Sequence, residues 1–350
     1  MRKKKIAIIF GGCSNEYPVS LQSAHAIISN IDVRRYETVL VGITKEGSWF
    51  RYYGEIDKIQ NDTWHLEERE CTPVMISPDR SLHGLIELRK EGIKYIKIDA
   101  AFPVLHGKNG EDGTVQGLIE LANIPLIGCG TLCSALCMDK DRAHRLVMAE
   151  GICTPKSVVI TKHYDSLILY DKTKDLSYPL FVKPVKSGSS IGITKVYDKK
   201  GLSEAVEIAF SYDNEIIIEE NIEGFEVGCA IIGNHDVMVG EVDEIELKEG
   251  FFDYNEKYTL KSSQIHMPAR IDKQTADRIK QTAVTIYRIL GCKGFARVDL
   301  FLTPDQRIVF NEVNTIPGFT SHSRYPNMMK EIGLPFEELL TKLIELGIET

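Results

Sequence analysis

The sequence contains no long apolar run and no excess of positive charge. The basic leader MRKKK is followed by IAIIF, an apolar stretch too short for a bilayer span or a signal-peptide core. The 350 residues include 42 Lys and Arg against 50 Asp and Glu, a formal net charge of -8. A nucleic-acid-binding protein would be expected to carry a basic stripe instead. We therefore expect a cytoplasmic protein that binds neither membrane nor nucleic acid.

Three familiar motifs are missing as well. The GG after the first apolar stretch lacks the third glycine of GxGxxG, and no GxxxxGK[ST] is present. The eight cysteines contain no CxxC pair; Cys129, Cys133 and Cys137 are spaced by four and would share one helical face. We therefore expect buried free thiols rather than a zinc site, and neither a dinucleotide fold nor a P-loop.

What is present is an alternation of apolar strands with helical or loop segments. KIAIIF, GGCSNEYPVS and LQSAHAIISNI read as strand, turn and helix, and further apolar runs follow at intervals. This pattern predicts a parallel sheet covered by helices, followed by two further α+β blocks. A more polar stretch at 62–92 reads as an inserted or irregular region.

The segment GFARVDLFLTPDQRIVFNEVN predicts a β-hairpin with a polar face. A two-residue turn at 305–306 would place Asp299 opposite Glu312 and Arg297 opposite Asn314. Two carboxylates and an amide at one sheet position suit Mg²⁺ that bridges phosphates. The alternative is a solvated hairpin with an Arg–Asn pair, although opposed carboxylates repel unless a cation separates them.

A second segment, KPVKSGSSIGI, combines a lysine with small residues. Its backbone N–H groups can form an anion nest, to which the hydroxyls of Ser189 and Ser190 add donors. Lys183 precedes the nest at the end of an apolar strand. A plain Gly/Ser hairpin is the alternative, but beside a predicted Mg²⁺ site the segment favours a phosphate lid.

Two glycine-rich stretches follow predicted strands. LHGKNGEDGTVQG carries His106 and an acidic pair, and its glycines permit close approach of a ligand. FGGCSNEYPVS places Glu16 after a strand and near the start of a helix. Taken alone, His106 would more often be structural.

Together these segments resemble the D-alanine–D-alanine ligase family of ATP-grasp enzymes over nearly the whole chain. GGCSNEYPVS resembles the family's first substrate loop, HGKNGEDGTVQG its second, KSGSSIG its phosphate lid, and ARVD with NEVNTIPG its metal and oxyanion segment. The resemblance implies a three-domain ATP-grasp fold, α/β and α+β, with an N-terminal doubly wound parallel-sheet domain. We expect domains at 1–135, 136–215 and 216–350, the last with a mobile loop at 248–268.

The resemblance also implies the reaction, which is ATP-dependent amide bond formation. A carboxylate is a poor electrophile, so the γ-phosphoryl group of ATP first converts the carboxylate of D-alanine to D-alanyl phosphate. Catalysis of that step is largely positioning and charge neutralisation. A non-catalytic ATP-binding protein of the same fold is the alternative from a different class. Loss of Arg297, Asp299 or Glu312 would favour that alternative, and all three are present.

The family pattern assigns roles to individual residues. Two Mg²⁺ ions, with Mn²⁺ as a substitute, would be held by Asp299, Glu312 and Asn314. The residues expected to contact ATP are Lys140, Lys183, Ser190, Glu219, Glu220, Asn221, Ile222 and Glu226. The residues expected to be catalytic are Glu16, Ser189 and Tyr258, which would form a hydrogen-bonded triad, with Arg297 and the N–H of Gly318 at the oxyanion. The residues expected to bind the amino-acid substrates are His106, Phe252, Lys257, Ser323 and Arg324.

The loop NTIPGFTSHSRYP predicts the second substrate. Lys257 and Tyr258 resemble ligases that use an amine nucleophile rather than D-lactate, whereas Arg324 resembles the vancomycin-resistance ligases. Only the D-serine type combines these features, and a guanidinium can donate to the serine hydroxyl. We therefore expect a D-alanine–D-serine ligase, with Phe252 as a pocket wall, D-alanine as a secondary substrate and a homodimeric assembly. A D-alanine–D-alanine ligase of cell-wall synthesis is the alternative.

Overall fold

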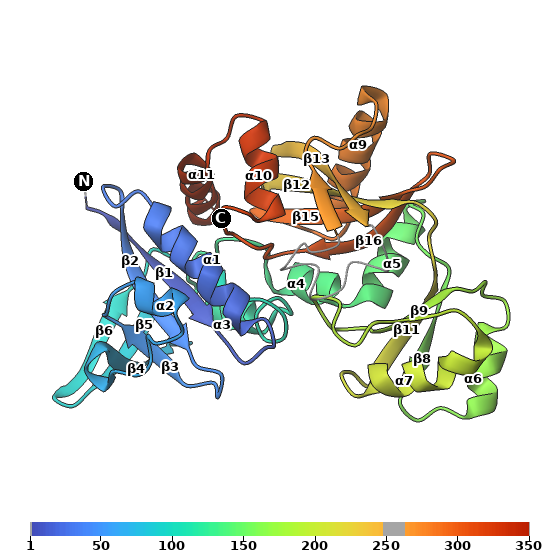
Figure 1. Cartoon of the computed structure of the whole chain (residues 1–350). Helices are drawn as coiled ribbons and strands as arrows, with labels where there is room; N and C mark the ends of the chain where they lie inside the picture. The colour runs from blue at the N-terminus through green and yellow to red at the C-terminus, as the bar shows by residue number, and fades with distance from the viewer. Residues whose placement is uncertain (1, 248–262, 350) are drawn as a thin grey trace.

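The computed structural model describes residues 2–247 and 263–349, which form three β-sheets (Figure 1). In Figure 1 the N-terminal sheet lies at the lower left, the central sheet at the lower right and the C-terminal sheet at the top. In the described part of the chain, no helix is long and apolar enough to cross a membrane. The predicted fold class, a mixed α/β architecture built from three blocks, is confirmed.

The N-terminal sheet has seven strands in the order β6-β5-β4-β3-β2-β1-β7. Only β2, β1 and β7 pair in parallel, so the parallel core is confined to one end of the sheet. The other pairs are antiparallel, and the stretch at 62–92 that reads as irregular contains the whole of β4 and β5. The bounds are β1 Lys4–Gly11, β2 Tyr36–Ile43, β3 Trp49–Tyr52, β4 Cys71–Ile76, β5 Gly84–Arg89, β6 Gly92–Lys97 and β7 Ala100–Val104.

Helices and short turns cover this sheet and lead to the second one. They are α1 Tyr17–Asn30, α2 Asp57–Gln60, η1 Glu68–Glu70, α3 Thr114–Leu121, α4 Thr131–Met138 and α5 Lys140–Ala149. The last helix begins at a capped end, because the Asp139 side chain accepts a hydrogen bond from the backbone N–H of Arg142. This cap sets the start of α5 at Lys140, a predicted ATP-binding residue.

The central sheet has four strands in the order β10-β9-β11-β8. Its interior side chains form a hydrophobic cluster of their own, which includes Leu169. The elements are β8 Ser157–Thr161, α6 Ser166–Thr173, β9 Leu180–Pro184, β10 Thr194–Val196, η2 Lys199–Gly201, α7 Leu202–Phe210 and β11 Glu215–Glu220.

The C-terminal sheet has five strands in the order β14-β13-β12-β15-β16. Its elements are β12 Phe225–Gly233, β13 Val237–Leu247, β14 Ser263–His266, α9 Lys273–Ile289, β15 Phe295–Leu302, β16 Ile308–Asn314, α10 Arg324–Glu331 and α11 Phe336–Ile348. The C-terminal helix α11 packs against α1 and β7 of the N-terminal sheet. One hydrophobic core is therefore shared between the first and last parts of the chain.

The predicted loop at 248–268 extends too far at its C-terminal end. Ser263–His266 form β14, which pairs antiparallel with β13. His266 is also bound through Nε2 to the Glu246 carboxylate at 2.6 Å. Residues 248–262 lie outside the described part, and the predicted domain boundaries stay predictions.

The expected buried thiols are found in the core. Cys129, Cys133 and Cys137 are all free and buried, but the prediction that they share one helical face is wrong for Cys129, which precedes α4, whereas Cys133 and Cys137 lie one turn apart on it. Cys292, from the turn after α9, joins them, and the Sγ atoms of Cys129, Cys133 and Cys292 lie within 4.8 Å of one another. The cysteines therefore link α4 to the C-terminal sheet by packing.

Candidate active site

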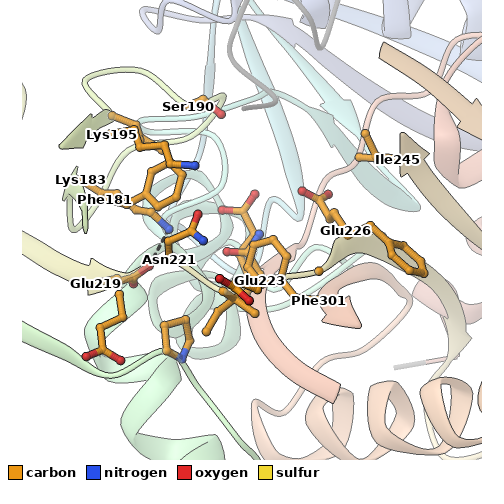
Figure 2. Close-up of a pocket in the computed structure, with 18 of the residues that line it drawn as sticks. Phe181, Lys183, Ser190, Lys195, Glu219, Asn221, Glu223, Glu226, Ile245 and Phe301 are labelled. Carbon is orange, nitrogen blue, oxygen red and sulfur yellow. Dashed lines mark hydrogen bonds and ion pairs between the residues drawn. The ribbon is translucent and has the colours of Figure 1, made fainter. Parts of the chain in front are cut away.

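A cavity of about 520 Å³ lies between the central and C-terminal sheets. Figure 2 shows Phe181, Lys183 and Lys195 on one side of it, facing Ile245 and Phe301 on the other. Apolar rings and aliphatic side chains thus alternate with charged ones along its walls. The structure brings all the predicted ATP-binding residues to this cavity: its lining includes Lys140, Lys183, Ser190, Glu219, Glu220, Asn221, Ile222 and Glu226.

A buried ion pair forms one wall of the cavity. Lys183 Nζ donates to Glu219 Oε2 at 2.6 Å, and the two side chains come from neighbouring strands, β9 and β11. Burial is the largest influence and would raise the pKa of Glu219, but the nearby cationic groups, Lys183 foremost, together outweigh it, so that pKa lies below its usual value. The pair therefore presents a fixed charge pattern to whatever enters the cavity.

Lys140 reaches the same cavity from the start of α5. Its Nζ donates to the carbonyl oxygen of Ser187 at 2.6 Å and lies 3.7 Å from the Glu312 carboxylate. This lysine therefore connects the loop after β9 with the β15–β16 hairpin. Both segments are predicted to meet the phosphates of ATP.

The pairing predicted for the β15–β16 hairpin is confirmed, but the predicted turn is wrong. Asp299 lies opposite Glu312 and Arg297 opposite Asn314. The turn holds three residues rather than two, since Thr303 pairs with Arg307, and Gln306 takes a φ of 62°. A bulge at 311 then shifts the register by one residue and restores the predicted pairs.

The bulge decides which side chains share a face. Without it, the three-residue turn would place Asn311 opposite Asp299 and would turn Glu312 toward the apolar face. With it, the oxygen-bearing side chains of Asp299, Glu312 and Asn314 lie on one face of the hairpin, and Glu312 lines the cavity. Asp299 accepts hydrogen bonds from Asn314 Nδ2 at 2.8 Å and from Arg297 Nη2 at 2.7 Å. An oxygen-only donor set of this kind fits Mg²⁺.

Glu16 and Ser189 meet although they lie 173 positions apart. The Ser189 hydroxyl donates to the Glu16 carboxylate, and both side chains are buried. Glycines make this approach possible: a methyl group added at Gly107 would lie 2.5 Å from Glu16 Oε2, and one at Gly188 would lie 2.9 Å from it. The first substrate loop, the second and the lid therefore converge on one carboxylate.

Glu111 also belongs to this region, and the sequence analysis did not single it out. Its carboxylate accepts hydrogen bonds from the backbone N–H groups of Gly107 at 2.8 Å and Ile316 at 3.2 Å. Burial and the nearby charge of Glu16 raise the pKa of Glu111 to about 8. Its place in an acidic pair within a glycine-rich loop was the available signal. The contact with Ile316 arises only in the tertiary structure.

His106 lies beside this group. It is buried, and burial lowers the pKa of its imidazole to about 4. Its Nε2 lies 3.4 Å from the Ser23 hydroxyl. His106 is therefore neutral near pH 7, and any contact with a substrate would involve a neutral ring.

Arg324 is not a surface charge. Its guanidinium is buried and binds Asp243 through Nε at 2.6 Å and Nη2 at 2.8 Å. Nη1 binds Glu226 at 3.0 Å and lies 3.5 Å from Asp299. Burial would lower the pKa of Arg324, but these carboxylates raise it, so the residue is always charged. Asp243, on β13, is fully buried and was missed by the sequence analysis.

Two more predicted residues lie just before α10. The Ser323 hydroxyl accepts a hydrogen bond from the backbone N–H of Thr320 at 2.9 Å. A methyl group at Gly318 would lie 2.9 Å from Ser323 Oγ, so the two residues are neighbours. Phe252, Lys257 and Tyr258 lie outside the described residues.

A cavity between two antiparallel sheets, walled by a lysine–glutamate pair and edged by oxygen ligands, defines an ATP-grasp enzyme. The family models agree: residues 5–129 match the D-ala D-ala ligase N-terminus and residues 146–345 match the D-ala D-ala ligase C-terminus. The chain belongs to the D-alanine–D-alanine ligase family and is an ATP-dependent ligase, in a family that uses ATP, Mg²⁺ and amino-acid substrates. This membership decides against the non-catalytic alternative.

Individual relatives cover the whole chain. The crystal structure of VanG D-Ala:D-Ser ligase from Enterococcus faecalis is 58% identical, with a TM-score of 0.92, and the match covers 99% of this chain and 100% of that one. The vancomycin B-type resistance protein VanB of Enterococcus faecalis is 46% identical over 100% of both chains. A D-alanine–D-alanine ligase of Caldicellulosiruptor bescii is 45% identical over 100% of this chain and 96% of its own length. The predicted resemblance to vancomycin-resistance ligases is confirmed.

Proposed function

We propose that this chain joins D-alanine to D-serine through a D-alanyl phosphate intermediate. The dipeptide would be a peptidoglycan precursor linked to vancomycin resistance. The observation that carries the proposal is the buried Arg324–Asp243 pair, whose arginine lies 3.5 Å from Asp299 of the β15–β16 hairpin and so offers a donor and an acceptor near the proposed metal ligands. Similarity to a D-Ala:D-Ser ligase over nearly the full chain supports it.

In the first step, the carboxylate of D-alanine attacks the γ-phosphorus of ATP, the bond from that phosphorus to the β–γ bridging oxygen breaks, and ADP leaves. Asp299, Glu312 and Asn314 would hold two Mg²⁺ ions, or Mn²⁺ in their place, and these ions neutralise charge on the phosphate oxygens. Lys140, 3.7 Å from Glu312, and Lys183 of the central sheet would add positive charge near the phosphates. Ser190 and its neighbouring backbone N–H groups would cover the phosphates and exclude water.

In the cavity, the nucleotide base would lie against the segment that joins the two sheets. Glu219, Glu220, Asn221 and Ile222 line the cavity there. Glu226 would bind the ribose, and its bond to Arg324 then links the nucleotide to the second substrate. Apolar contacts from Phe181 and Phe301 suit a flat base.

In the second step, the amine of the second substrate attacks the acylphosphate carbon, and phosphate leaves. Arg297 and the N–H of Gly318 would stabilise the negative charge that develops on the carbonyl oxygen. Glu16 would bind the ammonium group of D-alanine, and its bond to Ser189 would hold the lid closed over it. Tyr258 would complete that triad.

The second substrate would lie near α10. Ser323 would bind its carboxylate, and His106 and Lys257 would complete the surrounding contacts. The serine hydroxyl would accept a hydrogen bond from Arg324, which has five N–H donors and uses three of them on Asp243 and Glu226. The hydroxyl would donate to Asp243, with Phe252 as the opposite wall. D-alanine offers only a methyl group there, so it would remain a secondary substrate.

The test is amino-acid competition. The purified enzyme receives ATP, Mg²⁺, D-alanine and an equal concentration of D-serine near neutral pH, and the dipeptides are separated. We expect D-alanyl-D-serine as the main product. A product that is almost entirely D-alanyl-D-alanine would instead support the D-alanine–D-alanine ligase, which the similarity to the Caldicellulosiruptor bescii enzyme keeps as the second candidate.

The Arg324→Leu variant tests the selecting residue in the same assay. It should lose the preference for serine and keep some dipeptide synthesis. Because it leaves Asp243 buried without its partner, we also expect stability to fall by about 3–5 kcal/mol. Arg145→Leu, on the exposed side of α5, is the matched control and should change neither quantity. An unchanged serine-to-alanine ratio in Arg324→Leu would remove Arg324 as the selector.

We also propose a homodimeric assembly and a cytoplasmic reaction, where ATP is supplied. Both follow the habit of the family. Light scattering of the purified protein in the presence of ADP measures the assembly directly.

A further inference from the structure

His144 lies behind the ATP cavity and has no role in the mechanism above. It stands on α5, one turn after Lys140, and is buried. Its Nε2 bonds to the carbonyl oxygen of Asn311 at 2.8 Å, and its Nδ1 lies 3.7 Å from Glu219 Oε1. The ring also meets the edge of Phe310, with centroids 5.4 Å apart.

The carbonyl defines which nitrogen carries hydrogen. A carbonyl oxygen only accepts, so Nε2 of His144 must be the donor in this bond. Nδ1 then faces the Glu219 carboxylate across a gap too long for a hydrogen bond. Within the described residues, neither His144 Nδ1 nor Glu219 Oε1 has a hydrogen-bond partner. Buried polar atoms without partners are costly, so a retained pair points to a function.

The carbonyl that His144 binds belongs to the bulge of β16. That bulge is what turns Glu312 to the face of Asp299. A hydrogen bond to the extra residue of a bulge replaces a bond that the strand ladder cannot provide there. His144 therefore holds the irregularity on which the predicted Mg²⁺ ligands depend.

The other ring nitrogen of His144, Nδ1, faces Glu219, a residue proposed to bind the nucleotide. Glu219, which lines the cavity, binds Lys183 through Oε2 and presents its buried Oε1 toward His144. The imidazole of His144 thus lies between the Lys183–Glu219 ion pair of the central sheet and the β15–β16 hairpin of the C-terminal sheet.

We infer that His144 is a positioning residue that aligns Glu219 for the nucleotide and Glu312 for Mg²⁺. This inference rests on the proposed roles of Glu219 and Glu312. It predicts two separable effects, one on nucleotide affinity through Nδ1 and one on Mg²⁺ affinity through Nε2.

Two substitutions separate these effects. The amide nitrogen of glutamine can occupy the place of Nε2, so His144→Gln keeps the bond to Asn311 and loses the atom that faces Glu219. The amide of asparagine is shorter and matches Nδ1, so His144→Asn keeps a polar group at Glu219 and loses the bond to the bulge. His144→Leu removes both, and His235→Gln, on an exposed turn, is the control.

The experiment is calorimetric titration of ADP over a series of Mg²⁺ concentrations, with steady-state kinetics and the unfolding temperature measured beside it. We expect His144→Gln to weaken ADP binding about tenfold at saturating Mg²⁺ while its Mg²⁺ requirement stays near that of the parent. His144→Asn should raise the half-saturating Mg²⁺ concentration about tenfold with a smaller change in ADP affinity. In both variants KM for ATP should change more than kcat.

A purely structural role would give a different result. The unfolding temperature would then fall by a similar amount in all His144 variants, and their affinities for ADP and Mg²⁺ would stay within twofold of the parent. That result would show that the inference is wrong. If His144→Leu does not fold, the glutamine and asparagine variants decide. A parent protein that binds ADP but makes no dipeptide would overturn the proposed function and leave the inference standing.

Discussion

Two carboxyl groups, Glu16 and Glu111, influence each other electrostatically where the two glycine-rich loops meet. Glu16 is hydrogen-bonded to Ser189, and Glu111 is held by two backbone N–H groups. Because two buried negative charges that act on each other are unfavourable, one of the two carboxyl groups keeps its proton. The raised pKa of about 8 identifies Glu111 as that group. Glu16 is the residue proposed to bind the ammonium ion.

The same pair predicts how stability depends on pH. Glu111 binds its proton more tightly in the folded state, so folding takes up a proton between the usual glutamate value of 4.5 and about 8. Stability therefore falls as pH rises through that window. Glu111→Gln has no ionisable side chain at this position. The free energy of unfolding of the variant should therefore increase relative to that of the parent from pH 5 to pH 8, by an amount on the order of a few kcal/mol at most.

Urea unfolding of the parent and of Glu111→Gln at pH 5, 6, 7 and 8 measures this difference. Glu120→Gln, on α3, serves as the control for the loss of a carboxylate. A difference between Glu111→Gln and the parent that is constant across the series would rule out the raised pKa.

At the scale of elements, the geometry of the turn between β9 and β10 depends on a glycine, Gly188. Gly188 lies there against the Glu16 carboxylate. The neighbouring residues Ser189 and Ser190 take φ values of 50° and 58°, so the turn is bent tightly over the site. Such backbone strain is maintained where it serves a site.

Gly188→Ala should therefore disturb the Glu16–Ser189 contact. The added methyl group would lie 2.9 Å from Glu16 Oε2, closer than a carbon normally approaches. We expect kcat/KM for D-alanine to fall by a factor on the order of ten to a hundred, since the lid would close out of position. Initial-rate kinetics at saturating ATP measure it.

Gly201→Ala is the matched control for this change. Its added methyl group would meet only Val196, at an ordinary contact distance of 3.4 Å, and activity should stay within about twofold. Equal activity of the two variants would show that the lid tolerates the extra volume.

At the scale of the whole molecule, one aromatic cluster joins the first and last parts of the chain. Phe319 packs its ring against Phe102 of β7, at 6.1 Å between centroids, and against Phe295 of β15, at 5.3 Å. The central sheet has a separate core, which contains Leu169. The N-terminal and C-terminal sheets should thus unfold together, and the central sheet should depend on them less.

Phe319→Ala tests this division. The substitution should lower the free energy of unfolding by about 3–5 kcal/mol, because the void left by the missing ring lies in the core that both sheets share. Scanning calorimetry should show the transition of the N-terminal and C-terminal sheets move down. Leu169→Ala should lower the transition of the central sheet instead, and a single transition that responds equally to both variants would contradict the division.

The sequence by itself determined the local chemistry of this protein. An assumed two-residue turn predicted Asp299 opposite Glu312, and alternation along the strands placed the polar side chains on one face; the pairing is confirmed although the turn is wrong. Glycine and serine near Lys183 predicted the lid, and the family motifs predicted the residues that line the cavity. These inferences used residues that are close in the chain, where backbone geometry limits the outcomes.

The tertiary structure alone decided the contacts between distant segments. Arg324 and Asp243 are 81 positions apart, and no local pattern shows that they meet. The hairpin's predicted pairing depends on two irregularities whose effects on the register cancel, a longer turn and a bulge. The carbonyl oxygen of the bulge residue is bonded to His144 of helix α5. Such contacts depend on how helices and sheets pack against each other, and periodicity within one segment carries no information about that packing.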